Sequence, residues 1–190
     1  MTTALLITYV LLWLLVAALT VAVFALYHHF GQMYLSSREG RARDGPELHR
    51  QVKPARVRDL QGREVRVPRP AVPTMLFYAT TNCPLCTELL PALTEVAARE
   101  ADIETVVVCG DEPPAVAAWA DGLSSAAVVV PDGNRDLATR YGINTTPFLV
   151  LIDRDGVVRA KGIVNGREGL EQAVERLEAA LAHQEQGGET

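Results

Sequence analysis

Two cysteines, Cys83 and Cys86, stand three positions apart where a short apolar strand candidate, residues 75–79, gives way to a helix. Pro84 suits the first position of that helix, which needs no backbone N–H. A thiol at a helix N-terminus faces unpaired N–H groups and the positive end of the helix dipole, and both favour the thiolate. We therefore expect Cys83 to be the attacking nucleophile and Cys86, one turn later, to be the resolving thiol.

Other roles for this pair fit the sequence less well. A structural disulfide over this spacing closes too short a loop to restrain the unfolded chain much. A zinc site needs two further ligands, and the globular part offers only His49 and His183 at its edges, so no metal is expected. Coincidental spacing is disfavoured by the strand-to-helix position. Cys109, which ends an apolar run, is expected to be a buried and inert thiol.

The segments around the pair alternate between strand and helix patterns. A hairpin is expected at residues 56–67, and a helix at residues 84–100 should bend at Pro91. Further strands and helices follow at residues 103–109, 113–120, 126–130, 134–142, 148–152 and 157–160, with a final helix opening at 165–168. Asn134 is the expected N-cap of its helix. The order predicts an α/β fold with helices on both faces of a sheet.

A second site signal is Thr145-Thr146-Pro147, just before a predicted strand. A proline at a strand start is a place for a cis peptide bond. Beside the two thiols, such a bond would present the backbone of Thr146 to an extended substrate segment. Thr146 and Pro147 are therefore the candidate substrate-binding residues.

The N-terminal region carries no charged residue between Ala4 and Leu26. As a helix, this stretch is long enough to cross a bilayer core of about 30 Å. The expected division of the chain is a transmembrane anchor at 4–27, a juxtamembrane linker at 28–54, a globular domain at 55–183 and a disordered tail at 184–190. The net charge of −5 and the absence of a basic stripe argue against a nucleic-acid partner.

Together these motifs resemble the thioredoxin superfamily. The features are Cys-x-x-Cys after a strand, Pro91 five residues past the second cysteine, and Tyr-Gly-Ile…Thr-Pro-Phe-Leu-Val-Leu-Ile-Asp-x-Asp-Gly at 141–156. An extra strand–helix unit at 113–130 and the N-terminal hairpin are similar to the membrane-anchored TlpA/ResA-type and redoxin branch. Residues 158–168, with Cys-Pro-x-Cys and the apolar run, resemble the accessory proteins of methylamine utilisation.

The resemblance implies a thioredoxin-like fold with a central mixed sheet, and thiol–disulfide exchange. The expected clients are protein thiols or disulfides, including those of the methylamine dehydrogenase small subunit, with a membrane electron donor or acceptor. Cys83 and Cys86 take the redox-pair positions, Pro147 takes the cis-proline position, and no cofactor beyond the disulfide is implied. Asn82 and Thr87 depart from the Trp and Lys common in relatives, which leaves the direction of electron flow open.

Three alternatives stay open at this point. The same chemistry could reduce cytochrome c thiols before haem attachment. A peroxidase is suggested by the Thr-x-x-Cys of residues 80–83, although Leu76 stands where a peroxiredoxin proline is expected. A non-catalytic chaperone or metal-delivery module is the third.

Two features of the chain disagree on which side of the membrane the globular domain lies. Arg38, Arg41, Arg43 and Arg50 follow the apolar run, and the positive-inside rule would keep the domain cytoplasmic. Anchored thioredoxin-like maturation factors, by resemblance, work where disulfides persist. We therefore expect a single-pass membrane protein with an extracytoplasmic, periplasmic domain.

Overall fold

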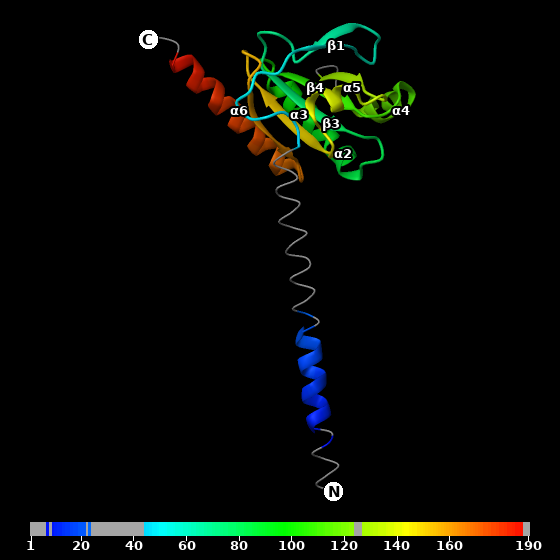
Figure 1. Cartoon of the computed structure of the whole chain (residues 1–190). Helices are drawn as coiled ribbons and strands as arrows, with labels where there is room; N and C mark the ends of the chain where they lie inside the picture. Colours follow the sequence, from blue (N-terminus) through cyan, green and yellow to red (C-terminus); the bar gives the residue numbers. More distant parts are fainter. Residues whose placement is uncertain (1–6, 8, 22, 24–43, 124–126, 188–190) are drawn as a thin grey trace. The chain divides into compact units, whose positions relative to one another are not determined.

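The computed structural model describes residues 7, 9–21, 23, 44–123 and 127–187, and the chain divides into units at 1–42 and 43–190. In the first unit, residues 9–21 are helical and their large apolar side chains are exposed (Figure 1). Of the helices in the described part, none is both long and apolar enough to cross a membrane. Parts of the expected anchor, 4–6 and 24–27 among them, lie outside the described residues.

The second unit begins earlier than the expected domain start at residue 55. Residues 44–54, assigned to the linker from sequence, lie against the domain. Gln51 forms a β-bridge with Val157, and the Val52 N–H donates to the Gly156 carbonyl at 2.8 Å. The rest of the expected linker, residues 28–43, lies outside the described part of the chain.

Strands and helices follow the order expected from the sequence. The strands are β1 (Ala55–Arg58), β2 (Glu64–Val67), β3 (Thr74–Ala79), β4 (Glu104–Cys109), β5 (Ala127–Pro131), β6 (Phe148–Ile152) and β7 (Val158–Ile163). The helices are α2 (Pro84–Glu88), α3 (Leu90–Arg99), α4 (Pro113–Trp119), a 3-10 turn at Ala120–Gly122, α5 (Asp136–Tyr141) and α6 (Arg167–Gly187).

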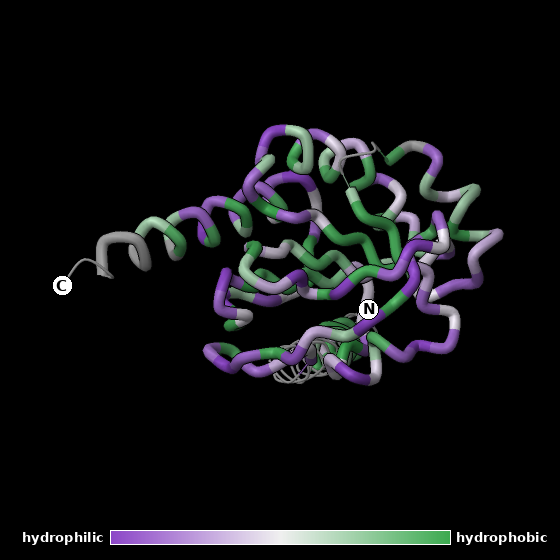
Figure 2. Tube along the Cα trace, turned by 90° about the horizontal axis from the view of Figure 1, so that it is seen from above, coloured by the Kyte–Doolittle hydropathy of each residue, from purple (hydrophilic) through white to green (hydrophobic). Residues whose placement is uncertain are grey.

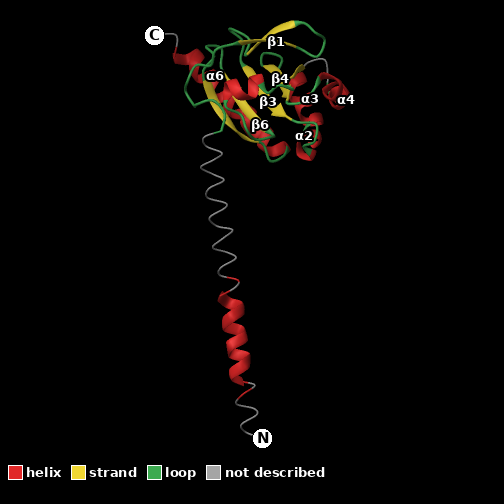
Figure 3. Cartoon of the chain, turned by 45° about the vertical axis from the view of Figure 1, so that its right-hand side comes forward, coloured by secondary structure: helices red, strands yellow, loops and turns green. Residues whose placement is uncertain are grey.

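A mixed sheet in the order β5-β4-β3-β6-β7 forms the centre of this unit (Figure 3). β3, β4 and β5 run parallel, whereas β6 and β7 are antiparallel to their neighbours. The extra unit, α4 with β5, adds the edge strand beyond β4. β1 and β2 form a separate antiparallel hairpin, as the Gly62 turn predicts. The mixed sheet of a thioredoxin-like fold is confirmed.

The sheet is covered on both faces because alternate residues of its central strands pack in opposite directions. In β3, Phe77 faces a cluster with residues of α3 and α6, and Tyr78 faces a cluster with residues of α5. All six residues of β3 are buried. Figure 2 shows the corresponding hydrophobic strands between more polar segments. Helices on both faces are therefore confirmed.

The helix carrying the cysteines is divided in two. α2 ends at Glu88 and α3 starts at Leu90, with Leu89 as the shared cap residue. Pro91 has no N–H to donate to the carbonyl four residues earlier, which accounts for the break. The expected bend is present, and it lies just before the proline.

One expected helix cap is wrong. Asn134 does not cap α5; the buried Asp132 carboxylate does, accepting the N–H groups of Leu137 and Ala138 at 3.0 Å each. α6 continues to Gly187, past the expected domain end at 183, and residues 188–190 of the expected tail lie outside the described residues. The other end of α5 is as expected, with Gly142 in the left-handed conformation.

Candidate active site

Cys83 and Cys86 form a disulfide at the start of α2, with their Cα atoms 5.2 Å apart. Cys83 is the N-cap residue, and its sulfur accepts the Cys86 N–H at 3.2 Å; Pro84 follows at N1. The two sulfurs differ in access, since Cys83 is half-buried and Cys86 is 0% exposed. An external thiol or disulfide can therefore reach only Cys83, in keeping with the roles expected from sequence.

The loop before Cys83 is held by a carboxylate from another strand. The Cys83 N–H donates to the Thr80 carbonyl at 3.2 Å. The Thr81 N–H donates to Oδ2 of Asp111 at 2.7 Å, and Asp111 follows the end of β4. β3 and β4 are parallel neighbours, so their carboxyl ends bring the two loops together at one edge. We name residues 80–83 the reactive loop.

The extra helix α4 also reaches α2. Trp119 Nε1 donates to the Thr87 hydroxyl at 2.9 Å, and that hydroxyl donates to the Cys83 carbonyl at 3.4 Å. Thr87 stands where the resemblance leads one to expect Lys. Here its hydroxyl ties the first turn of α2 to the extra unit.

A cis peptide bond joins Thr146 and Pro147, as the sequence predicts. Pro147 is buried and Thr146 is half-buried. Phe148, the first residue of β6, pairs with Tyr78 near the end of β3. The register therefore places the cis bond at the edge of the sheet from which the reactive loop emerges. We name residues 142–147 the docking loop.

A buried carboxylate, Asp44, lies beneath the docking loop. It accepts the N–H groups of Asn144 at 2.7 Å and of Thr145 at 3.0 Å, and also the Thr145 hydroxyl. Burial raises the pKa of Asp44, but the hydrogen bonds from Thr145 and Asn144 outweigh it and hold that pKa below its ordinary value. Asp44 is thus a carboxylate that accepts hydrogen bonds.

Cys109 ends β4 and is 0% exposed. Burial raises the pKa of its thiol to about 12, and the Asp111 carboxylate, which accepts the thiol proton at 3.6 Å, adds to the shift. A thiol in this setting forms almost no thiolate near neutral pH. The expectation of a buried, inert cysteine fits this environment.

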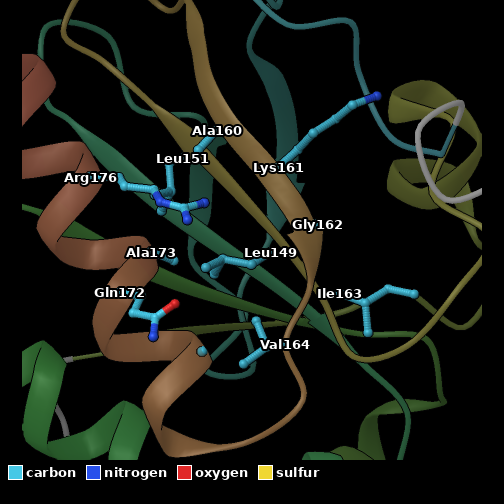
Figure 4. Close-up of a pocket in the computed structure, with 11 residues that line it drawn as sticks. Leu149, Leu151, Ala160, Lys161, Gly162, Ile163, Val164, Gln172, Ala173 and Arg176 are labelled. Atoms are coloured by element: carbon cyan, nitrogen blue, oxygen red, sulfur yellow. The ribbon is translucent and has the colours of Figure 1, made fainter. Parts of the chain in front are cut away.

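A cleft with a volume of about 180 Å³ lies between α6 and the β6–β7 edge of the sheet (Figure 4). Its floor is apolar, with Leu149 and Leu151, and Gln172 and Arg176 of α6 stand at its side. Neither Cys83 nor Pro147 lines it. The cleft is therefore separate from the candidate site.

Three residues that support the site do not follow from the sequence motifs: Asp44, Asp111 and Trp119. Asp44 was included in the linker, although Asp-Gly-Pro at 44–46 is a turn signal. Asp111 lies two residues past a buried strand, and Trp119 is one of two tryptophans in the chain. Their positions along the chain do not show which residues they contact. Only the folded structure brings Asp44 to the docking loop, Asp111 to the reactive loop and Trp119 to α2.

Residues 49–161 match the AhpC/TSA family, over more than half of the chain. The methylamine utilization protein MauD of Paracoccus versutus is 27% identical, and the alignment covers 93% of this chain and 91% of that protein. The fold is similar to two solved structures at 18% identity each. A putative DsbE thiol:disulfide interchange protein of Chlorobium tepidum has a TM-score of 0.61, with 70% of this chain and 99% of that chain covered. A putative protein disulfide isomerase of Bacteroides thetaiotaomicron has a TM-score of 0.62, with coverage of 73% and 95%.

At that identity the two structures bear on the fold alone, whereas the family match and the MauD alignment run along the sequence itself. The region matched to the family, residues 49–161, contains the Cys83–Cys86 disulfide and the cis Thr146–Pro147 bond. The chain belongs to the AhpC/TSA family and is similar to MauD.

Proposed function

We propose that the protein is a membrane-anchored thiol–disulfide oxidoreductase that acts in the maturation of other proteins. The observation that carries this proposal is the unequal access of the two bonded sulfurs at the start of α2. Cys83 is half-buried and Cys86 is fully buried. A partner sulfur can approach the first, and the second lies within bonding distance to complete the exchange.

The exchange proceeds through a mixed disulfide. In the reducing direction, the Cys83 thiolate attacks a client disulfide, so that a Cys83–client bond forms and one client thiolate leaves. The Cys86 thiolate then attacks Cys83, the Cys83–Cys86 disulfide forms, and the second client thiolate is released. The pair loses two electrons and the client gains them; the oxidising direction is the reverse. The Cys83/Cys86 pair itself holds these two electrons in its dithiol form, so the exchange needs no separate cofactor.

The docking loop supplies a place for the client chain. The half-buried Thr146 precedes the cis bond at the same sheet edge as the reactive loop. An extended segment that pairs with the Thr146 backbone would bring its own sulfur toward Cys83. Backbone pairing of this kind recognises extended shape more than side-chain identity.

The proposed client is the disulfide-rich small subunit of methylamine dehydrogenase, in which the protein would form or rearrange disulfides. Similarity to MauD along nearly the whole chain supports this assignment. Peroxide reduction is a less suitable activity, because Leu76 stands where a peroxiredoxin proline is expected and the Cys-x-x-Cys spacing suits dithiol exchange.

The proposed location is a single-pass anchor with an extracytoplasmic, periplasmic domain. In residues 7–23, the large apolar side chains of the described positions are 45–69% exposed, which in a water-soluble setting would be a large apolar surface. The Thr20 hydroxyl donates to the Val16 carbonyl at 2.8 Å, which satisfies a polar group without water. Reporter fusions on both sides of this segment test the orientation; a cytoplasmic C-terminus would contradict it.

The Cys86→Ser variant tests the function directly. With the resolving thiol removed, the full-length protein should accumulate a mixed disulfide on Cys83 with its client. The matched Cys83→Ser variant should trap nothing and lose exchange activity by more than about a thousandfold. Normal client maturation in the Cys83→Ser strain would reject the proposal.

The reduction potential of the pair tests the direction. A value near about −120 mV favours an oxidant, and one near about −270 mV favours a reductant such as one acting on cytochrome c thiols.

A further inference from the structure

Asp44 makes an unusually complete set of hydrogen bonds to the docking loop. Its carboxylate accepts the Asn144 side-chain amide at 3.1 Å, in addition to both backbone N–H groups and the Thr145 hydroxyl. Asp44 is 5% exposed. These donors belong to the two residues directly before Thr146, so the carboxylate determines where the chain enters the cis bond.

The backbone of the same segment is held from a third element. Lys161 of β7 donates its ammonium protons to the carbonyls of Asp44 at 2.7 Å and Gly45 at 3.3 Å. In Figure 4 the Lys161 side chain points away from α6. The Gly45 N–H donates to the Gly142 carbonyl at 2.8 Å. The Asp44–Gly45 segment is therefore attached to both the start and the middle of the docking loop.

Gly45 also packs on the residue that follows the cis bond. Its φ is +72°, and an added Cβ would lie 2.5 Å from Cε1 of Phe148. Only glycine combines that backbone conformation with so close an approach. Phe148 is 0% exposed and starts β6. The segment thus contacts the chain before Thr146 and after Pro147, and leaves those two residues between its contacts.

We propose that Asp44 is a positioning residue for client binding, which it controls by fixing the docking loop while leaving the sulfur chemistry of Cys83 unchanged. This inference rests on the proposed exchange function. Without the carboxylate, the donors of Asn144 and Thr145 lose their common acceptor and the loop shifts. A displacement of even about 1 Å in a substrate-positioning element can lower a rate by about a hundredfold. A small disulfide that needs no docking would be spared.

The test compares two probes on the reduced full-length protein. One is an extended peptide whose single cysteine is joined to nitrothiobenzoate; the other is the small disulfide 5,5′-dithiobis(2-nitrobenzoate). For Asp44→Ala, we expect the rate constant with the peptide to fall by about tenfold or more and that with the small disulfide to stay within about twofold. Asp44→Asn, which keeps one acceptor oxygen, should give an intermediate loss.

Asp59→Ala is the matched control. Asp59 is also a buried carboxylate, 3% exposed, and it accepts a backbone N–H and a guanidinium proton of Arg63 in the β1–β2 turn. Its loss should leave both rate constants unchanged. Thr145→Val removes a single donor from the Asp44 site, so it should lower the peptide rate constant by a smaller factor than Asp44→Ala does. It keeps the inference testable if Asp44→Ala does not fold.

The outcomes separate this inference from the proposed function. Equal losses with both probes, or an unchanged peptide rate constant in the Asp44 and Thr145 variants, would overturn the positioning role and leave the exchange function standing. A wild-type protein that reacts with neither probe would overturn the exchange function and the positioning role together.

Discussion

The reactive loop and the docking loop leave the sheet at one edge, and each is fixed by a carboxylate from elsewhere in the chain. The Asp111 carboxylate accepts one backbone hydrogen bond from the reactive loop, from the Thr81 N–H 30 residues earlier in the chain. The two carboxylate oxygens of Asp44 accept four hydrogen bonds from Asn144 and Thr145 of the docking loop, about 100 residues away. The reactive chemistry is therefore mostly local to the Cys-x-x-Cys turn, whereas client binding depends on a segment that precedes the whole sheet.

Acid should weaken the docking loop first. Because hydrogen bonds outweigh burial and lower the pKa of Asp44 below 3.8, its stabilisation is complete above pH 3.8 and is lost as pH falls through the folded-state pKa. Asp44→Asn should lower the free energy of unfolding by about 2–3 kcal/mol at pH 7, and by less at lower pH. Denaturant unfolding of the full chain at pH 7 and in acid measures this. A loss that stays constant across that pH range would show that ionisation of Asp44 does not matter.

The reactive loop should respond to a different substitution. Asp111→Ala removes the acceptor of the Thr81 N–H, at an expected cost of about 1–2 kcal/mol in the free energy of unfolding. Because the loop carries Cys83, rates with the peptide and the small disulfide should change by the same factor. Asp121→Ala, an exposed carboxylate in the 3-10 turn, is the control. A change confined to the peptide would erase the distinction between the two loops.

The smallest expected effect belongs to the link from α4. Trp119→Phe keeps an aromatic ring and removes the hydrogen bond to Thr87, which should cost about 0.5–1.5 kcal/mol in unfolding free energy. Trp13→Phe, at the other tryptophan of the chain, should leave the stability of the sheet unit unchanged. If both variants leave the free energy of unfolding unchanged, the Trp119–Thr87 hydrogen bond does not stabilise α2, and local contacts alone hold the reactive loop.

The same contrast between local and distant contacts explains which site residues could be predicted from the sequence. Cys83, Cys86 and the cis bond at Pro147 follow from short motifs, because residues within one turn or one strand end determine their geometry. The alternation of strands and helices likewise predicts the sheet and its covering layers. Asp44 could not be assigned in that way: its partners are about 100 residues away, and its neighbours have a linker composition. Asn134 lies close to the start of α5, and a residue of its type at that place predicts a cap. The actual acceptor, Asp132, lies farther from the helix start, where the sequence pattern does not point to it.

A protein that exchanges disulfides with its clients runs a risk of exchanging them with itself. The third cysteine, Cys109, ends the strand next to β3 and is two residues from the carboxylate that holds the reactive loop. With its side chain sealed in the core and its proton retained, it offers no intramolecular competitor for the mixed disulfide on Cys83. Its burial confines the exchange to a single pair, so that in the reducing direction the step that releases the client also forms the Cys83–Cys86 bond.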